Sequence, residues 1–120
     1  MKYLLIITTN PEIWESLTRE RRNEVFAAHD RFRIEIVEPG ELCSSVALAD
    51  PSNTRTVRVR DGEAVVTDEP CASAKELLAG YYLVECDTLE RATELAAAIP
   101  DARLTAVEVR PLMHLAGLEM

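Results

Sequence analysis

Two short segments rich in large apolar and aromatic residues constrain the possible folds of this chain more than any other feature. The first runs from Tyr3 to Ile7 and the second from Tyr81 to Val84. Strands that are apolar on both faces are typical of sheets that are covered on both sides. We therefore expect one sheet that contains both segments and needs a cover for each of its faces.

The periodicity of apolar residues predicts the other elements. Thr18 and Thr88 are suited to be helix N-caps, and Asp61 and Gly62 are suited to a type I′ hairpin turn, which requires positive φ. In chain order we predict a strand over 3–8, a short helical turn over 12–17, a helix over 18–38, a strand over 42–48, hairpin strands over 54–60 and 63–67, a strand over 77–86, a helix over 89–99 and a strand over 104–110.

The order of these elements predicts an α+β fold. Without the hairpin around Asp61 and Gly62, the order is β-α-β-β-α-β, which is the ferredoxin-like arrangement. Two helices can cover only one face of such a sheet, so a second copy of the chain is the expected cover for the other face. The sequence thus predicts a homodimer.

The long predicted helix has an apolar stripe that we expect to face the sheet. His29 follows Val25 by four residues and precedes Phe32 by three, so it shares this stripe. An imidazole between a helix and a sheet can act as a general acid or base. The apolar positions that define the stripe are Val25, Phe26, Phe32, Ile36 and Val37.

Charge and composition exclude several classes of function. The chain has 13 Lys and Arg against 21 Asp and Glu, a formal net charge of −8, which disfavours nucleic acids and anionic membranes as partners. No apolar run approaches the roughly 20 residues that span a bilayer. Three cysteines without metal-ligand spacing, and no Gly-rich phosphate loop, lead us to expect no metal and no cofactor. The expected location is the cytoplasm.

Six segments of the chain carry motifs whose order and spacing are distinctive: 1–3, 56–63, 67–71, 75–76, 80–82 and 107–111. Taken together, these motifs resemble the DGPF branch of the YCII-related proteins. The resemblance covers residues 1–113, which we take as one domain, with 114–120 as a C-terminal tail.

The resemblance implies the dimeric α/β-barrel type of the ferredoxin-like fold. Some YCII-related proteins act in the breakdown of chlorinated aromatics. Many DGPF members are encoded beside sigma factors of the extracytoplasmic-function class, which makes a sigma-factor-related partner an expectation by analogy. The family's Asp-Gly-Pro-Phe motif is altered here, because the chain has Asp68, Glu69, Pro70 and Cys71 in its place.

The resemblance also implies a catalytic pair, formed by a His on the long helix and a downstream Asp. Glu38 stands at the matching offset, but it lies nine residues after His29, which is about 900° of helix rotation and places the two on opposite faces. We therefore expect Asp68 to be the acidic partner of His29. The alternatives are that His29 is a buried histidine bonded to backbone or water, and that Asp68 is only a turn residue.

A second group of residues is predicted to bind a small anionic or aromatic ligand. Arg58 and Arg60 lie on one face of their strand, and arginine binds carboxylates with two hydrogen bonds. The alternative is that both are solvated or form ion pairs. The full predicted ligand set is Arg58, Arg60, Cys71, Lys75 and Tyr82.

Two functions of different classes follow from these predictions, and a third hypothesis is a degenerate family member that retains only the dimer fold. The first is a dimeric small-ligand-binding or regulatory module. The alternative is a small-molecule enzyme of lyase or hydrolase type that uses His29 and Asp68 as an acid–base pair. Whether the two side chains open into one pocket is the feature that separates these hypotheses.

Overall fold

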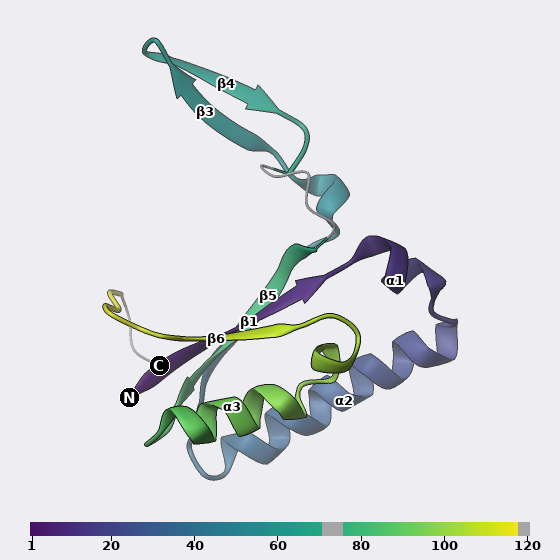
Figure 1. The fold of residues 1–120 in the computed structure, drawn as a ribbon, viewed down its shortest axis with the longest axis vertical. Helices are drawn as coiled ribbons and strands as arrows, with labels where there is room; N and C mark the ends of the chain where they lie inside the picture. The colour runs from purple at the N-terminus through teal and green to yellow at the C-terminus, as the bar shows by residue number, and fades with distance from the viewer. Residues whose placement is uncertain (71–75, 118–120) are drawn as a thin grey trace.

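The computed structural model describes residues 1–70 and 76–117 of the chain. Figure 1 shows a sheet with helices on one side and a hairpin that extends away from it. The elements are β1 (Lys2–Thr9), α1 (Pro11–Ser16), α2 (Arg19–Val37), β2 (Leu42–Ala47), η1 (Pro51–Asn53), β3 (Thr56–Arg60), β4 (Glu63–Thr67), β5 (Leu77–Glu85), α3 (Leu89–Ala98), η2 (Pro100–Arg103) and β6 (Val107–Pro111).

The main sheet has the strand order β2-β5-β1-β6, with every neighbouring pair antiparallel. The segments 3–7 and 81–84 lie in the two central strands, with Leu5 opposite Tyr82 and Tyr3 opposite Val84. This α+β arrangement is compatible with the predicted ferredoxin-like fold. The edge strands β2 and β6 each pair with one central strand.

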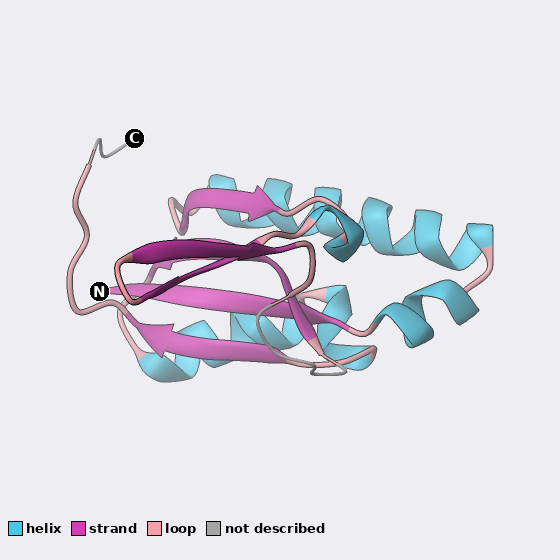
Figure 2. Cartoon of the chain, turned by 90° about the horizontal axis from the view of Figure 1, so that it is seen from above, coloured by secondary structure: helices cyan, strands magenta, loops and turns pink. Residues whose placement is uncertain are grey.

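The core lies between one face of the sheet and the helices α2 and α3, whose arrangement beside the strands is shown in Figure 2. Alternate residues of β1, namely Tyr3, Leu5 and Ile7, are buried toward the helices, as the two-residue period of a strand requires. The other buried members of the core are Phe32, Ile36, Tyr82, Val84, Cys86, Ala92, Leu95, Ala96 and Ile99.

The helix starts follow the capping residues of the sequence. The side chains of Thr18 and Thr88 accept hydrogen bonds from the backbone N–H groups of Arg21 and Arg91, respectively. The prediction that the whole apolar stripe of α2 faces the sheet was wrong in part, because Phe26 is 56% exposed. Val37, the last residue of the helix, is also exposed, while the other three stripe positions are buried.

The end of the chain differs from the strand predicted over 104–110. After α3 the chain makes the short helix η2, and β6 begins only at Val107. Pro100 cannot continue α3 but suits the first position of a new helical turn. The backbone N–H groups of Leu104 and Thr105 both donate to the carbonyl of Asp101, so this segment turns instead of extending.

The face of the sheet opposite the helices is not covered by any described element. The register places two rows of side chains across it. Leu4 and Ile6 of β1 lie at the centre of these rows, and both are half-buried. The rows are Arg110, Leu4, Leu83 and Ser44, and Glu108, Ile6, Tyr81 and Val46.

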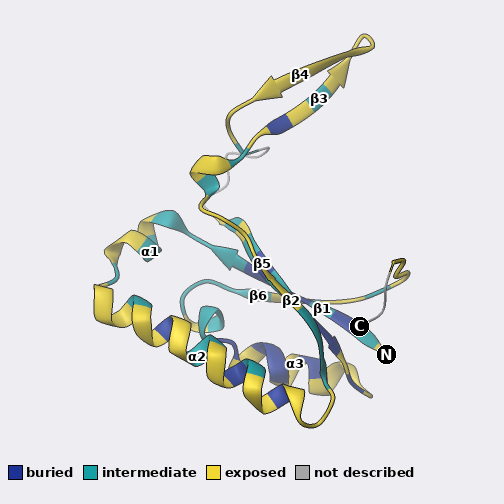
Figure 3. Ribbon diagram, turned by 180° about the vertical axis from the view of Figure 1, so that it is seen from behind, coloured by how far each residue is buried: buried dark blue, intermediate teal, exposed yellow. Residues whose placement is uncertain are grey.

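The hairpin β3–β4 forms a separate two-stranded sheet that projects from the main sheet. Its turn is the one predicted, with positive φ of 53° at Asp61 and 78° at Gly62. Figure 3 shows that most of the hairpin is exposed. Its exposed apolar side chains are Val57, Val59, Val65 and Val66.

Among residues 1–70 and 76–117, no helix combines the length and the apolar character that crossing a bilayer requires.

Candidate functional site

A pocket of about 480 Å³ opens between α2 and the sheet. Phe32 and Ile36 of α2 pack on the core. Other residues of the same helix line the pocket, namely Val25, Phe26, His29, Asp30 and Arg33. The volume lies within the range of roughly 300–1,000 Å³ that is typical of small-molecule sites. One helix therefore contributes both to the core and to the border of the cavity.

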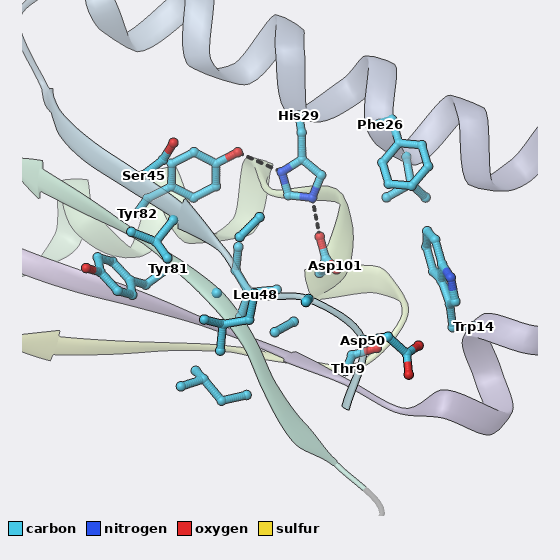
Figure 4. A pocket seen from close by; sticks show the side chains of 18 of the residues that line it. Thr9, Trp14, Phe26, His29, Ser45, Leu48, Asp50, Tyr81, Tyr82 and Asp101 are labelled. Atoms are coloured by element: carbon cyan, nitrogen blue, oxygen red, sulfur yellow. Dashed lines mark hydrogen bonds and ion pairs between the residues drawn. The ribbon is translucent and has the colours of Figure 1, made fainter. Parts of the chain in front are cut away.

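His29 connects two other polar groups of the pocket (Figure 4). Its Nδ1 atom lies 2.7 Å from Oη of Tyr82, and its Nε2 atom lies 2.5 Å from Oδ1 of Asp101. The side chains of His29 and Asp101 are only 18% and 15% exposed. The three residues come from α2, β5 and η2, so tertiary structure alone brings them together.

The chemistry of these groups determines the direction of each hydrogen bond when the imidazole is neutral. An ionised carboxylate can only accept, so Nε2 of His29 donates to Asp101. The unprotonated Nδ1 then accepts from the hydroxyl of Tyr82. This is the arrangement by which a carboxylate orients a histidine toward a hydroxyl group.

Tyr82 is held firmly in its position. Its ring meets that of Phe32 edge to face at 5.0 Å between centroids and stacks against His29 at 5.9 Å. Burial raises the pKa of the Tyr82 hydroxyl above its usual value of 10.0, although the charge of nearby Arg33 acts in the opposite direction. The hydroxyl therefore keeps its own proton at neutral pH.

Asp101 is positioned by the turn that follows α3. Its backbone carbonyl accepts from Leu104 and Thr105, and the hydroxyl of Thr105 donates to the carbonyl of Thr8 in β1. These bonds attach η2 to the end of the central strand and direct the carboxylate of Asp101 toward α2. Sequence reasoning missed Asp101; the available signal was an acidic residue directly after Pro100, at the start of a turn.

The rest of the pocket is mainly apolar. Trp14 and Phe26 form one wall, with their rings 5.6 Å apart in an edge-to-face arrangement. Gly80, together with Ala47 of the neighbouring strand, leaves room near the sheet because neither has a large side chain. The remaining apolar lining residues are Ile7, Val25, Val46, Leu48, Ala49, Pro51, Leu78 and Ala79.

The structure does not bring His29 and Asp68 together. The Asp68 side chain is 86% exposed beyond the end of β4 and lies 3.5 Å from Arg55. The expected pairing of Asp68 with His29 is therefore corrected, since Asp101 occupies that place. Glu38 is exposed at the C-cap of α2 and is not a partner of His29.

The other predicted site residues lie in different places. Tyr82 lines the pocket. Arg58 and Arg60 belong to the projecting hairpin and are not among the residues that line the pocket, so they form no common site with His29 within the described chain. Cys71 and Lys75 lie outside the described residues.

Comparison with known proteins identifies a family model and a relative that match most of the chain. A model of the YCII-related domain matches residues 1–116. An uncharacterized protein from Rhizobium meliloti is 29% identical over 114 residues, which are 93% of this chain and 92% of the relative.

Proposed function

The chain belongs to the YCII-related family, and on this premise we propose that it is a small-molecule enzyme that transfers protons through Tyr82, His29 and Asp101. One observation carries the proposal: the hydroxyl, imidazole and carboxylate form a continuous hydrogen-bonded series at the wall of an open pocket. Such a series can accept a proton from a bound molecule and return it.

In the neutral form of His29, the series acts as a base. A proton passes from the substrate to Oη of Tyr82 while the proton of Tyr82 passes to Nδ1 of His29. The imidazolium that forms is stabilised by the carboxylate of Asp101. Because the pKa of Tyr82 is raised, a free tyrosinate is avoided and the two transfers are coupled.

In the protonated form of His29, the series acts as an acid. Nδ1 then donates to Oη of Tyr82, which leaves the hydroxyl proton free for a basic atom of the substrate. One site can therefore remove a proton at one position and deliver a proton to another. Isomerisation and elimination are the reaction classes that require both steps.

Hydrogen–deuterium exchange tests this proposal while the substrate is still unidentified. The protein is incubated in D₂O with small carbonyl compounds that carry acidic, neutral or basic groups, and deuterium uptake is followed by NMR. We expect exchange of at least one compound, slowed about 10²–10⁴-fold by Tyr82→Phe or His29→Gln. Asp68→Asn serves as the control and is expected to leave the rate unchanged, because Asp68 is remote from His29.

Exchange that persists at the wild-type rate in Tyr82→Phe would contradict the proton-transfer series. Absence of exchange with every compound would favour a second candidate, a small-ligand-binding or regulatory module. One observation supports that candidate: both ring nitrogens of His29 already have hydrogen-bond partners within the protein, so neither is free to bond a substrate directly. Binding without exchange is the result that this second function predicts.

We also propose that the protein works as a homodimer in which the uncovered sheet faces meet. The face carries Leu4, Ile6 and Tyr81 near its centre and Glu108 and Arg110 at one edge. A two-fold axis places a surface against itself, so neighbouring charges of opposite sign can pair across the interface. The dimeric α/β-barrel is the assembly that fits this geometry.

A further inference from the structure

The charged residues of the pocket carry information about its ligand. Among the described residues that line it, the acidic ones are Asp30, Asp50 and Asp101, and the basic one is Arg33. With a neutral His29 the lining therefore carries three negative charges and one positive charge, a formal net charge of −2. With a protonated imidazole the net charge is −1, so the pocket is negative in either state of His29.

Two of these carboxylates are already paired within the protein. Asp30 forms an ion pair with Arg33, one turn further along α2, so the positive charge of Arg33 is compensated in place. Asp101 is bonded to His29. Neither Arg33 nor His29 is thus available as a free cation for an anionic ligand.

Asp50 differs from the other two carboxylates. It precedes η1, where its Oδ1 accepts from the backbone N–H of Ser52. The hydrogen bonds from Ser52 lower the pKa of its carboxyl group, so Asp50 is ionised at neutral pH. Within residues 1–70 and 76–117 it forms no ion pair, and its negative charge at the pocket is uncompensated.

An aromatic wall stands on the same side of the pocket as Asp50 (Figure 4). Trp14 and Phe26 form this wall, and the guanidinium of Arg22 lies 5.5 Å from the centre of the Trp14 ring. Arg22 does not line the pocket; its Nε donates to the backbone carbonyl of Trp14, which places the guanidinium over the ring. Aromatic faces attract ammonium groups in the same way.

We infer that the pocket selects a small apolar molecule that carries a protonated amine. The aliphatic and aromatic lining holds the body of the molecule, and the ammonium group lies toward Asp50 and the wall of Trp14 and Phe26. This inference rests on the proposed function only in taking the pocket as a small-ligand site.

The inference reverses the expected preference for anionic ligands. That expectation depended on Arg58 and Arg60, which lie on the projecting hairpin. A carboxylate in the pocket would meet Asp50 and Asp101 with no unpaired cation among the described lining residues. Like charges at short range disfavour binding, and more so in a partly buried site than in water.

A series of ligands with one body and different charges tests the inference. The probes are 2-phenylethylamine, 2-phenylethanol and 3-phenylpropanoate. Trp14 is the only tryptophan of the chain, so its fluorescence reports binding at the pocket wall directly. We expect the amine to bind about ten-fold more tightly than the carboxylate, with the alcohol between them.

Variants of matched chemistry assign the preference to Asp50. Asp50→Asn keeps a side chain that can cap η1 but removes the charge, and we expect it to weaken the amine about five-fold and to leave the alcohol unchanged. Asp68→Asn makes the same substitution on an exposed residue beyond β4 and should leave all three affinities unchanged.

Two results would overturn the inference: equal or tighter binding of the carboxylate to the wild-type protein, or no fluorescence change with the amine. The assay does not depend on catalysis. If the protein binds the amine but exchanges no deuterium, this inference stands and the proton-transfer proposal fails. If the protein exchanges deuterium but does not bind the amine, the proton-transfer proposal stands and this inference fails.

Discussion

Gly80 is the residue at which the requirements of the sheet and of the pocket meet. It lies in β5 opposite Ala47 of β2, and a Cβ atom built on it would overlap the carbonyl oxygen of Val46. Backbone cannot move aside as a flexible side chain can. We therefore expect Gly80→Ala to destabilise the protein by about 1–3 kcal/mol, measured by urea unfolding.

The control for this substitution is Gly62→Ala, which adds the same methyl group at the hairpin turn. No atom of the described residues lies within 4 Å of a Cβ built there, and the positive φ of 78° opposes the change. Because the hairpin forms its own small sheet, global unfolding should scarcely change. A Gly80→Ala protein as stable as Gly62→Ala would refute the close approach of the two strands.

The hydrogen bonds of His29 predict which tautomer the imidazole adopts. Because Asp101 accepts from Nε2 and Tyr82 donates to Nδ1, the neutral ring should carry its hydrogen on Nε2. ¹⁵N NMR of the side chain distinguishes the two tautomers, with His114, the second histidine of the chain, as a reference.

We expect the Nε2–H tautomer to remain the major form in Tyr82→Phe, since Asp101 still accepts from Nε2. In Asp101→Ala we expect this tautomer to be no longer the major form. A wild-type ring with its hydrogen on Nδ1 would contradict the direction of the series.

At the scale of elements, one ion pair joins the start of α3 to the start of β2. Nε and Nη2 of Arg91 donate to the two carboxylate oxygens of Glu41, each at 2.8 Å. These hydrogen bonds lower the pKa of Glu41 below its usual 4.5. The stabilisation is therefore present above the unfolded pKa and is lost as pH falls through the folded pKa.

We expect Arg91→Gln to be less stable than the wild type at about pH 6 and to approach it by about pH 3, as Glu41 becomes protonated. Unfolding in urea across this pH range measures the difference. Arg21→Gln is the control, because Arg21 pairs with Glu24 within one exposed turn of α2. A stability difference for Arg91→Gln that is independent of pH would exclude the assigned cause.

The hairpin β3–β4 is expected to be dispensable for the rest of the fold. Its valines are exposed, and Thr56 and Thr67 face each other across its base. Replacement of residues 57–66 by Asn-Gly, a two-residue turn, should therefore leave the thermal unfolding temperature of the main sheet within a few degrees. A large decrease, measured by circular dichroism, would mean that the hairpin packs against another part of the assembly.

At the scale of the whole molecule, the uncovered face of the sheet predicts the oligomeric state. Ile6 is half-buried near its centre, whereas Ile34 is exposed on α2. We expect the wild type to be a dimer by light scattering and Ile6→Lys to be a monomer, because a buried unpaired charge is costly. Ile34→Lys makes the same substitution outside the interface and should stay dimeric. A wild-type monomer at micromolar concentration would contradict the proposed assembly.

The sequence predicted most of the elements because their signals are local. Thr18, Thr88 and the pair Asp61 and Gly62 act on backbone atoms within a few residues, so their effects could be predicted from the sequence alone. The period of the apolar residues likewise identified the strands and the order of the fold. The start of β6 was predicted at residue 104 instead of Val107, because the strand-like pattern of the sequence extends back into the turn that begins at Pro100.

The candidate site could be predicted only in part, for the same physical reason. His29 was selected through its place on the apolar face of α2, and Tyr82 belongs to the segment 80–82 that carries the family resemblance. Asp101 lies 72 residues from His29, and no local pattern connects the two. Asp68 was chosen instead because it belongs to a recognisable motif, yet its position beyond β4 separates it from α2.

The sequence by itself determined which segments become helices, strands and turns, because capping, periodicity and turn conformation depend on near neighbours. The tertiary structure decided which of the many acidic residues meets His29 and which stripe residues line a cavity instead of the core. It also decided that the predicted hairpin, which carries the arginines of β3, does not contribute these arginines to the pocket. Those outcomes depend on how α2 packs across the sheet and where η2 attaches to β1, and packing between distant segments leaves no periodic signal in the chain.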